Sequence, residues 1–290
     1  MSTEPEPPFH KENIYIIDPE NAAEVARLVN LDRLTTKAMG GPLAGLPALP
    51  KDAQILDIAC GPGGWVLDIA FAHPYIDVAG IDISQTMIKY AGARARSQGL
   101  ENASFGVMDA SEPLDFSDNT FHLVNGRYLF GSLQREKWPQ LLGECMRILR
   151  PGGILRMCEA ELAGKTNSAA YEQLNAWFAQ ALQRGGYGFS CDGRTFGIMP
   201  VLPALLRNAG CEDIQLQAYA IDFSAGTETW ADFYHNAAVG FKMLEPFFFR
   251  TQVTTQPEFD EVYARAMQEM HMDTFCGVWY FLGVWGIKPV

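Results

Sequence analysis

The residues of this chain best suited to chemistry are a run of glycines and an aspartate that follows them. Gly61, Gly63 and Gly64 leave one turn of the chain without side chains, so its backbone can approach a ligand closely. Asp82 comes 21 positions after Gly61. At that spacing a carboxylate reaches the tip of a neighbouring strand, where it can accept hydrogen bonds from both hydroxyls of a ribose. The pattern indicates a site for a cofactor that contains a ribose.

Three local elements must position these residues. Residues 55–58 form a short apolar run, which is typical of a strand buried on both faces of a parallel sheet. Residues 65–72 carry apolar side chains at helical spacing, so the glycine-rich turn joins a strand to the N-terminus of a helix. Such a turn presents backbone N–H groups and the positive end of a helix dipole to a ligand. Residues 76–82 are expected to form the neighbouring strand.

Residues 55–64, the aspartate at position 82 and the turn at residues 149–153 resemble the class I S-adenosylmethionine-dependent methyltransferases. The resemblance covers roughly residues 50–160 and is nearest to the small-molecule subgroup that includes the ubiquinone and menaquinone biosynthesis methyltransferases. It implies an enzyme of secondary metabolism that moves the methyl group of S-adenosylmethionine to O, N or C of a small, largely apolar metabolite, mainly by proximity and orientation. The product would be S-adenosylhomocysteine. The cofactor-binding residues that it implies are Asp57, Ala59, Gly61, Gly63, Asp82, Ile83, Met87, Met108, Asp109, Ala110, Asn125 and Arg127.

Two other classes of protein stay open. A dinucleotide fingerprint would place a third glycine three residues after Gly63, and Val66 at that position argues against a nicotinamide-dependent oxidoreductase. A non-catalytic S-adenosylmethionine-binding protein with the same fold is the second alternative. The intact Gly61, Gly63, Asp82 and Asp109 count against it, because a dead site would be free to lose them.

The resemblance implies an α/β fold, a Rossmann-like seven-stranded sheet with an antiparallel seventh strand and helices on both faces. We expect a disordered tail (1–12), an N-terminal helical lid (13–50), a cofactor-binding core (51–162) and a remainder (163–290) that completes the sheet. Two insertions in that remainder, about 163–198 and 224–273, are expected to cap the substrate. The other predicted strands are 102–107, 116–124 with its turn, 154–161, 214–223 and 274–288, and the other helices 20–34, 84–98, 136–149, 168–184, 200–208, 229–248 and 257–272.

Aromatic residues are concentrated in the second half of the chain. Residues 1–159 hold 12 of the 34 and residues 160–290 hold 22, although packing of the added helices accounts for most of them. The remainder would line an apolar pocket over the methyl donor. Tyr15 resembles a lid residue, or else it packs the first helix against the body. The expected substrate residues are Tyr15, Tyr128, Trp230, Tyr234 and His235.

Several polar residues are open to more than one interpretation. His235 is the candidate catalytic base, which an acceptor that is protonated at neutral pH would need. A buried, hydrogen-bonded histidine is the structural alternative. Arg127 could hold the methionine carboxylate of the cofactor or could pair within the protein. Glu159 and Glu161 flank the end of the fifth strand, where one of them could contact the substrate.

The composition of the chain limits the kinds of molecule that it is expected to bind. The formal charge of −12 and the lack of any basic run argue against nucleic acid and favour a small molecule, apolar or aromatic. No apolar run reaches about 18 residues, so no membrane span is expected. The six cysteines form no close pair and no metal spacing, so we expect reduced thiols, no metal and a cytoplasmic location. The oligomeric state is left open.

Overall fold

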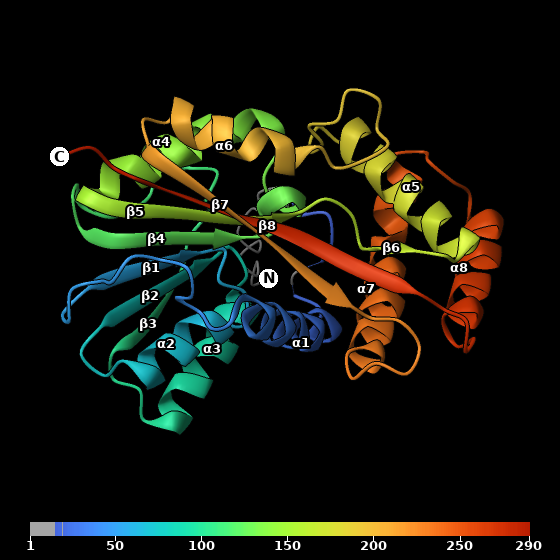
Figure 1. The fold of residues 1–290 in the computed structure, drawn as a ribbon, viewed down its shortest axis with the longest axis horizontal. Helices are drawn as coiled ribbons and strands as arrows, with labels where there is room; N and C mark the ends of the chain where they lie inside the picture. Colours follow the sequence, from blue (N-terminus) through green and yellow to red (C-terminus); the bar gives the residue numbers. More distant parts are fainter. Residues whose placement is uncertain (1–14, 19) are drawn as a thin grey trace, which may run out of the picture.

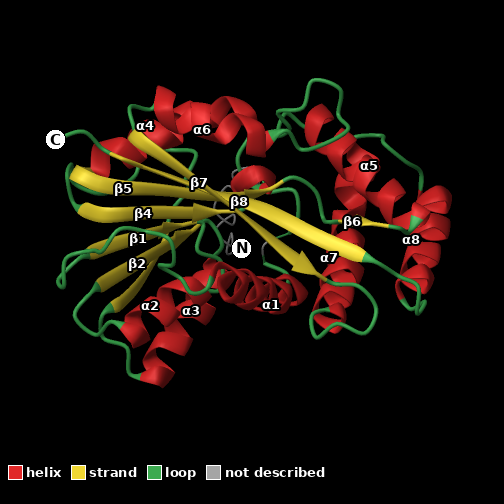
Figure 2. Ribbon diagram, viewed as in Figure 1, coloured by secondary structure: helices red, strands yellow, loops and turns green. Residues whose placement is uncertain are grey.

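Five parallel strands bring their carboxyl ends to one edge of a mixed sheet (Figures 1 and 2). The computed structural model describes residues 15–18 and 20–290. The strands are β1 (Gln54–Ile58), β2 (Asp77–Asp82), β3 (Ala103–Val107), β4 (Phe121–Arg127), β5 (Leu149–Ala160), β6 (Lys165–Thr166), β7 (Glu212–Asp222) and β8 (Gly277–Ile287). The helices are α1 (Ala22–Met39), α2 (Gly64–Ala72), α3 (Gln85–Gln98), the 3-10 turns η1 (Leu129–Gly131) and η2 (Arg135–Lys137), α4 (Trp138–Ile148), α5 (Ala169–Arg184), α6 (Ile198–Asn208), α7 (Trp230–Arg250) and α8 (Gln256–Met270).

The order of the strands confirms the predicted class of fold. The sheet runs β3-β2-β1-β4-β5-β8, and β7 pairs with β8. Strands β1 to β5 are parallel to one another, whereas β8 is antiparallel to β5 and β7. One detail differs from the seven strands expected, because Lys165 and Thr166 form an eighth, β6. β8 is longer than its pairing with β5, and its first residues, Gly277 and Val278, bond to β6 instead.

Helices cover both faces of the sheet. In Figure 1, α4 and α6 lie on one side and α1, α2 and α3 on the other. Strand β1 is buried, with Ile55, Leu56 and Ile58 fully inaccessible, as its continuous apolar run predicts. The helix α1 begins after Asn21, whose side chain accepts a hydrogen bond from the N–H of Ala23, and it ends at Gly40 in the left-handed conformation.

Helices α5, α7 and α8 pack against one another beyond the carboxyl edge of the sheet (Figure 1). They come from the two predicted insertions. Helix α1 packs against α7, so the N-terminal helix meets the second insertion. The predicted tail at residues 1–12 lies outside the described residues. In the part of the chain that the structure describes, no helix has both the length and the hydropathy to cross a membrane.

Candidate active site

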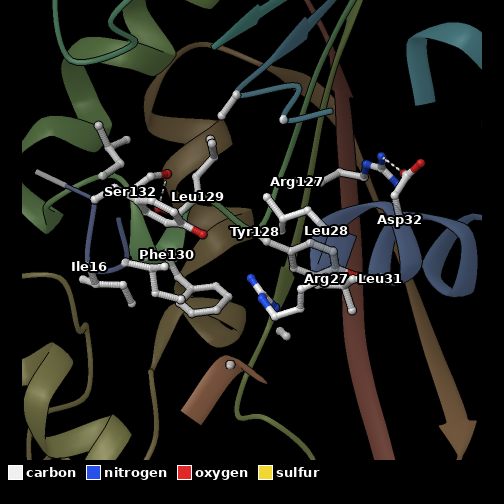
Figure 3. A pocket seen from close by; sticks show the side chains of 18 of the residues that line it. Ile16, Arg27, Leu28, Leu31, Asp32, Arg127, Tyr128, Leu129, Phe130 and Ser132 are labelled. Atoms are coloured by element: carbon white, nitrogen blue, oxygen red, sulfur yellow. Dashed lines mark hydrogen bonds and ion pairs between the residues drawn. The ribbon is translucent and has the colours of Figure 1, made fainter. Parts of the chain in front are cut away.

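A cavity lies at the carboxyl edge of the sheet, between the strand ends and helices α1 and α7. The ends of β1, β2, β4 and β5 form its floor, and residues 127–133 form one side. Figure 3 shows side chains of α1 (Arg27, Leu28, Leu31 and Asp32) at this cavity together with those at and after the end of β4 (Arg127, Tyr128, Leu129, Phe130 and Ser132). This is the place where the parallel topology predicts a ligand site.

Two carboxylates are fixed at the strand ends by backbone N–H groups. Asp82, at the end of β2, accepts hydrogen bonds from the N–H of Gly61 at 2.9 Å and from that of Ser84 at 2.9 Å. Burial raises the pKa of Asp82 above its ordinary value. Asp109, after β3, accepts from the N–H of Ser111 at 2.8 Å. Both carboxylates line the cavity in fixed orientations, ready to accept further hydrogen bonds.

All of the residues predicted to bind the cofactor line the cavity, with two exceptions, Gly63 and Asn125. A Cβ at Gly63 would lie 2.7 Å from the ring of Phe105 and 2.8 Å from Cβ of Ala91. Gly63 also has a φ of 76°. Its lack of a side chain therefore allows the turn to pack against β3 and α3, and Gly63 itself does not line the cavity.

Asn125 lies one step behind the cavity, in a polar row that crosses the sheet. Asp57, Asn125 and Arg156 occupy paired positions on β1, β4 and β5. Asn125 donates to Asp57 Oδ1 at 2.6 Å and accepts from Arg156 Nε at 2.6 Å. The Arg156 guanidinium lies over the Trp65 ring and donates to the carbonyl of Pro42 at 2.8 Å. The row orients Asp57, which alone of the three lines the cavity.

Burial dominates the electrostatics of this row. It raises the pKa of Asp57 to about 6 and lowers the pKa of Arg156 to about 10. Sequence reasoning missed Arg156 altogether. The available signal was an arginine in the middle of the strand predicted at residues 154–161, flanked by apolar residues, where a charge is costly unless it has partners.

Arg127 pairs within the protein, which is one of the two roles considered for it. Its guanidinium forms an ion pair with Asp32 of α1 and donates to Thr36 Oγ1 at 3.3 Å. The buried Nε of Arg127, however, has no hydrogen-bond partner among the described residues. A buried donor without a partner is costly and is commonly satisfied by a ligand. The carboxylate of an amino-acid group is an acceptor of the right charge for it.

Glu159 stabilises the segment after β4 that forms one side of the cavity. This buried carboxyl group accepts hydrogen bonds from the N–H of Leu129 at 2.8 Å and from that of Phe130 at 3.4 Å. Burial raises its pKa to about 8. Tyr128, the residue before Leu129, has a φ of 59°, a backbone conformation that non-glycine residues rarely adopt. Glu159 thus holds a strained turn, and Glu161 accepts from Met199 N–H at 3.3 Å at the start of α6.

The expected substrate residues divide into two groups. Tyr15 and Tyr128 line the cavity, but Trp230, Tyr234 and His235 are not among the described residues that do. Trp230 stacks on Tyr234 and donates its Nε1–H to the carbonyl of Met270 at 2.9 Å. His235 is exposed and donates from Nδ1 to the carbonyl of Ala231 at 2.7 Å.

The three α7 residues expected to contact the substrate therefore lie on a side of the helix that does not line this cavity. A different side of this helix meets the cavity, and its residues recur at the spacing of one face. Trp230 and Tyr234 pack toward His271, at the end of α8. The apolar stripe at residues 233, 237, 240, 241 and 244 was the signal for the right face. The α7 residues that line the cavity are Phe233, Asn236, Ala237, Gly240, Phe241 and Leu244.

Known proteins resemble this chain in the same region. Residues 55–153 match the family described as a methyltransferase domain. Methyltransferase pytC of Aspergillus terreus is 28% identical over 207 residues, 70% of this chain and 59% of the relative. The demethylmenaquinone methyltransferase of Anoxybacillus flavithermus is 26% identical over 184 residues, 60% of this chain and 76% of the relative. A phosphoethanolamine N-methyltransferase 2 of Haemonchus contortus, solved with phosphomonomethylethanolamine and S-adenosylhomocysteine, superposes with a TM-score of 0.53 at 18% identity, over 93% of this chain and 58% of that one.

The chain has a Rossmann-like α/β fold with two fixed carboxylates at the edge of the sheet, and the match over residues 55–153 identifies this region as a methyltransferase domain. Over 60–70% of its length the chain is similar to methyltransferases, as the resemblance to the class I S-adenosylmethionine-dependent enzymes implied. The match spans 59% of the length of the Aspergillus relative. The family resemblance stated from the sequence is confirmed.

Proposed function

We propose that the protein transfers the methyl group of S-adenosylmethionine to O, N or C of a small, largely apolar metabolite. One observation carries this proposal. A single cavity joins the carboxylates Asp82 and Asp109 to an apolar region lined by Phe233, Phe241 and Leu244. A cofactor held by the first region would have its reactive end directed to the second.

The chain's own residues would bind and orient the reactants. We assign Asp82 to the ribose hydroxyls and Asp109 to the adenine amine. Arg127 Nε and Asp57 suit the carboxylate and the ammonium group of the methionine part, because one is an unpaired buried donor and the other an acid fixed by Asn125. When bound, S-adenosylmethionine supplies an electrophilic methyl group on a good leaving group. The protein then needs chiefly alignment and exclusion of water.

A histidine base has no place in this proposal. Among the described residues that line the cavity there is no histidine, and His235 faces away from it. The part of the cavity proposed to hold the methyl acceptor is mostly apolar. Its described side chains therefore provide no strong base. We therefore favour acceptors whose nucleophilic atom is already deprotonated or uncharged near neutral pH.

We further propose a cytoplasmic role in secondary metabolism, with no nucleic-acid partner. All six cysteines are free thiols, which supports a reducing compartment. The net charge of −12 would repel a phosphate backbone. In the described part of the chain, no group of three or more His, Cys, Asp or Glu side chains could hold a metal ion.

Two measurements test the proposal. Calorimetric titration should detect binding of S-adenosylmethionine and S-adenosylhomocysteine, and not of NADH. Incubation with methyl-labelled S-adenosylmethionine and a panel of apolar acidic phenols, aromatic amines and 1,3-diketones should then move label into at least one acceptor. Binding without any transfer across a wide panel would favour a non-catalytic protein, and no binding would refute the site.

A further inference from the structure

We propose that Arg27 and Asn236 together recognise an oxygen atom of the methyl acceptor, which makes the acceptor an apolar molecule with a carbonyl oxygen. The inference rests on the proposed function and adds to it the residues that select the substrate. Both side chains line the apolar half of the cavity, Arg27 from α1 and Asn236 from α7. They lie 209 positions apart in the sequence and are hydrogen-bonded to each other.

Arg27 is held in one orientation at the wall of the cavity (Figure 3). It donates from Nε to Glu24 Oε2 at 2.7 Å and from Nη2 to Glu24 Oε1 at 2.7 Å. The Tyr15 hydroxyl donates to the same carboxylate at 2.8 Å. The side chain of Glu24 is fully buried and that of Arg27 is 11% exposed. A planar guanidinium fixed at two points directs its remaining nitrogen, Nη1, toward α7.

The contact with Nη1 determines how Asn236 faces the cavity. An arginine can only donate hydrogen bonds, so the oxygen of Asn236 must face Nη1, at 2.9 Å. The amide nitrogen of Asn236 must then point away from Arg27. No described residue accepts a hydrogen bond from this nitrogen, and the residue lines the cavity. A donor with two hydrogens thus lies among apolar side chains, where a ligand acceptor atom would be held strongly.

The charges of the wall decide which acceptor atoms fit. Among the described residues that line the cavity, the cationic side chains are Arg27 and Arg127, and each is already paired with a carboxylate, Glu24 and Asp32. A buried phosphate would need cations that are not neutralised. A neutral carbonyl oxygen needs only donors, and this pair provides them.

There is space beside the pair for such a group. Gly240 follows Asn236 by one turn of α7, and a Cβ built on it would lie 3.6 Å from Cδ of Arg27. No side chain at position 240 therefore lies between α7 and the aliphatic part of Arg27, and both residues line the cavity. An aromatic or aliphatic acceptor can therefore lie against Arg27 while its oxygen meets Asn236.

The test compares two probes of nearly equal shape, 2-acetylnaphthalene and 2-isopropenylnaphthalene, binding to protein saturated with S-adenosylhomocysteine. Fluorescence titration gives both dissociation constants, and their ratio isolates the contribution of the oxygen. Replacing Asn236 by leucine should lower the preference for the ketone by about tenfold, the effect of one buried hydrogen bond. The neutral double variant Glu24→Gln with Arg27→Gln should lower it too, without leaving a buried unpaired charge. 2-Naphthyl phosphate should not displace the ketone.

Arg33→Ala is the matched control. Arg33 lies on the same helix and pairs with Asp232 of α7, but it is not among the described cavity residues. This variant should keep the wild-type ratio. An unchanged ratio in Asn236→Leu, or the absence of binding by both probes, would overturn the inference while leaving cofactor binding, and with it the proposed function, intact. Failure to bind S-adenosylhomocysteine would instead contradict the proposed function.

Discussion

The two halves of the cavity are built by different means. In the cofactor half, Asp82 and Asp109 lie at the ends of parallel strands and are oriented by backbone N–H groups. In the acceptor half, Arg27 and Asn236 are oriented by each other and by Glu24, from two helices that meet at the edge of the sheet. The first half is a property of the backbone, whereas the second depends on the packing of α1 against α7.

The largest effect on the cofactor half is expected from a substitution of Asp82. Asp82→Ala removes a charged acceptor for the ribose and leaves the N–H groups of Gly61 and Ser84 without their partner. A charge-assisted hydrogen bond contributes about 1.5–3 kcal/mol, so binding of S-adenosylmethionine should weaken by roughly one to two orders of magnitude. Calorimetry checks this, with circular dichroism to confirm folding. An unchanged dissociation constant in a folded variant would remove Asp82 from the site.

Gly240→Leu should affect the opposite half. A leucine side chain at this position on α7 would fill the space beside Arg27, and glycine to leucine is favourable within a helix. Turnover of an acceptor should fall by about tenfold or more, with the dissociation constant of S-adenosylmethionine unchanged. Gly240→Ala, whose Cβ makes an ordinary contact, is the control and should stay close to the wild type. Equal losses of cofactor binding and turnover would mean that the two halves are not separate.

The pH dependence of cofactor binding should reveal Asp57. Its folded-state pKa is raised to about 6 by burial, so it is ionised at pH 7 and becomes neutral as the pH falls below about 6. The affinity for S-adenosylmethionine should therefore decrease by up to about tenfold between pH 7 and pH 5. Asp57→Asn, which keeps the hydrogen bond with Asn125, should bind more weakly and with a flat profile over this range. A wild-type profile in that variant would exclude Asp57 as the group that titrates.

The smallest effect is expected at His235. Its side chain is exposed and bonded to a carbonyl of its own helix, so His235→Ala should change turnover by less than about twofold. Rates measured from pH 6 to 9 should have the same shape in both proteins. The loss of an ionisation from the profile of the variant would show that His235 acts as a base after all.

The cofactor half was more accessible to prediction than the acceptor half, for a physical reason. The strand at 55–58, the glycine turn and the acid at position 82 are local patterns, and the parallel topology then brings the strand ends together. The order of helices and strands followed from periodicity in the same way. The face that α7 presents depends on how the helix is rotated against α1, which its own sequence expresses only as a stripe.

Contacts between distant segments were beyond local patterns altogether. The pairing of Arg27 with Asn236 needs the packing of α1 on α7, and the row formed by Asp57, Asn125 and Arg156 needs the register of three strands. Neither can be read from residue spacing. The short strand β6 was missed because two residues carry no periodicity.

The contact between α1 and α7 should also affect the rate at which the acceptor enters the cavity. Besides Arg27 with Asn236, the two elements are joined near the surface by Arg33 with Asp232 and by Lys37 with Glu228 just before α7. Exposed ion pairs of this kind contribute about 0–1 kcal/mol each and are screened by salt. Separation of the helices would open the cavity between them, so the association rate constant of the acceptor should rise with ionic strength in stopped-flow traces. Ion pairs that contribute little to the stability of the fold would then limit the association rate of the acceptor.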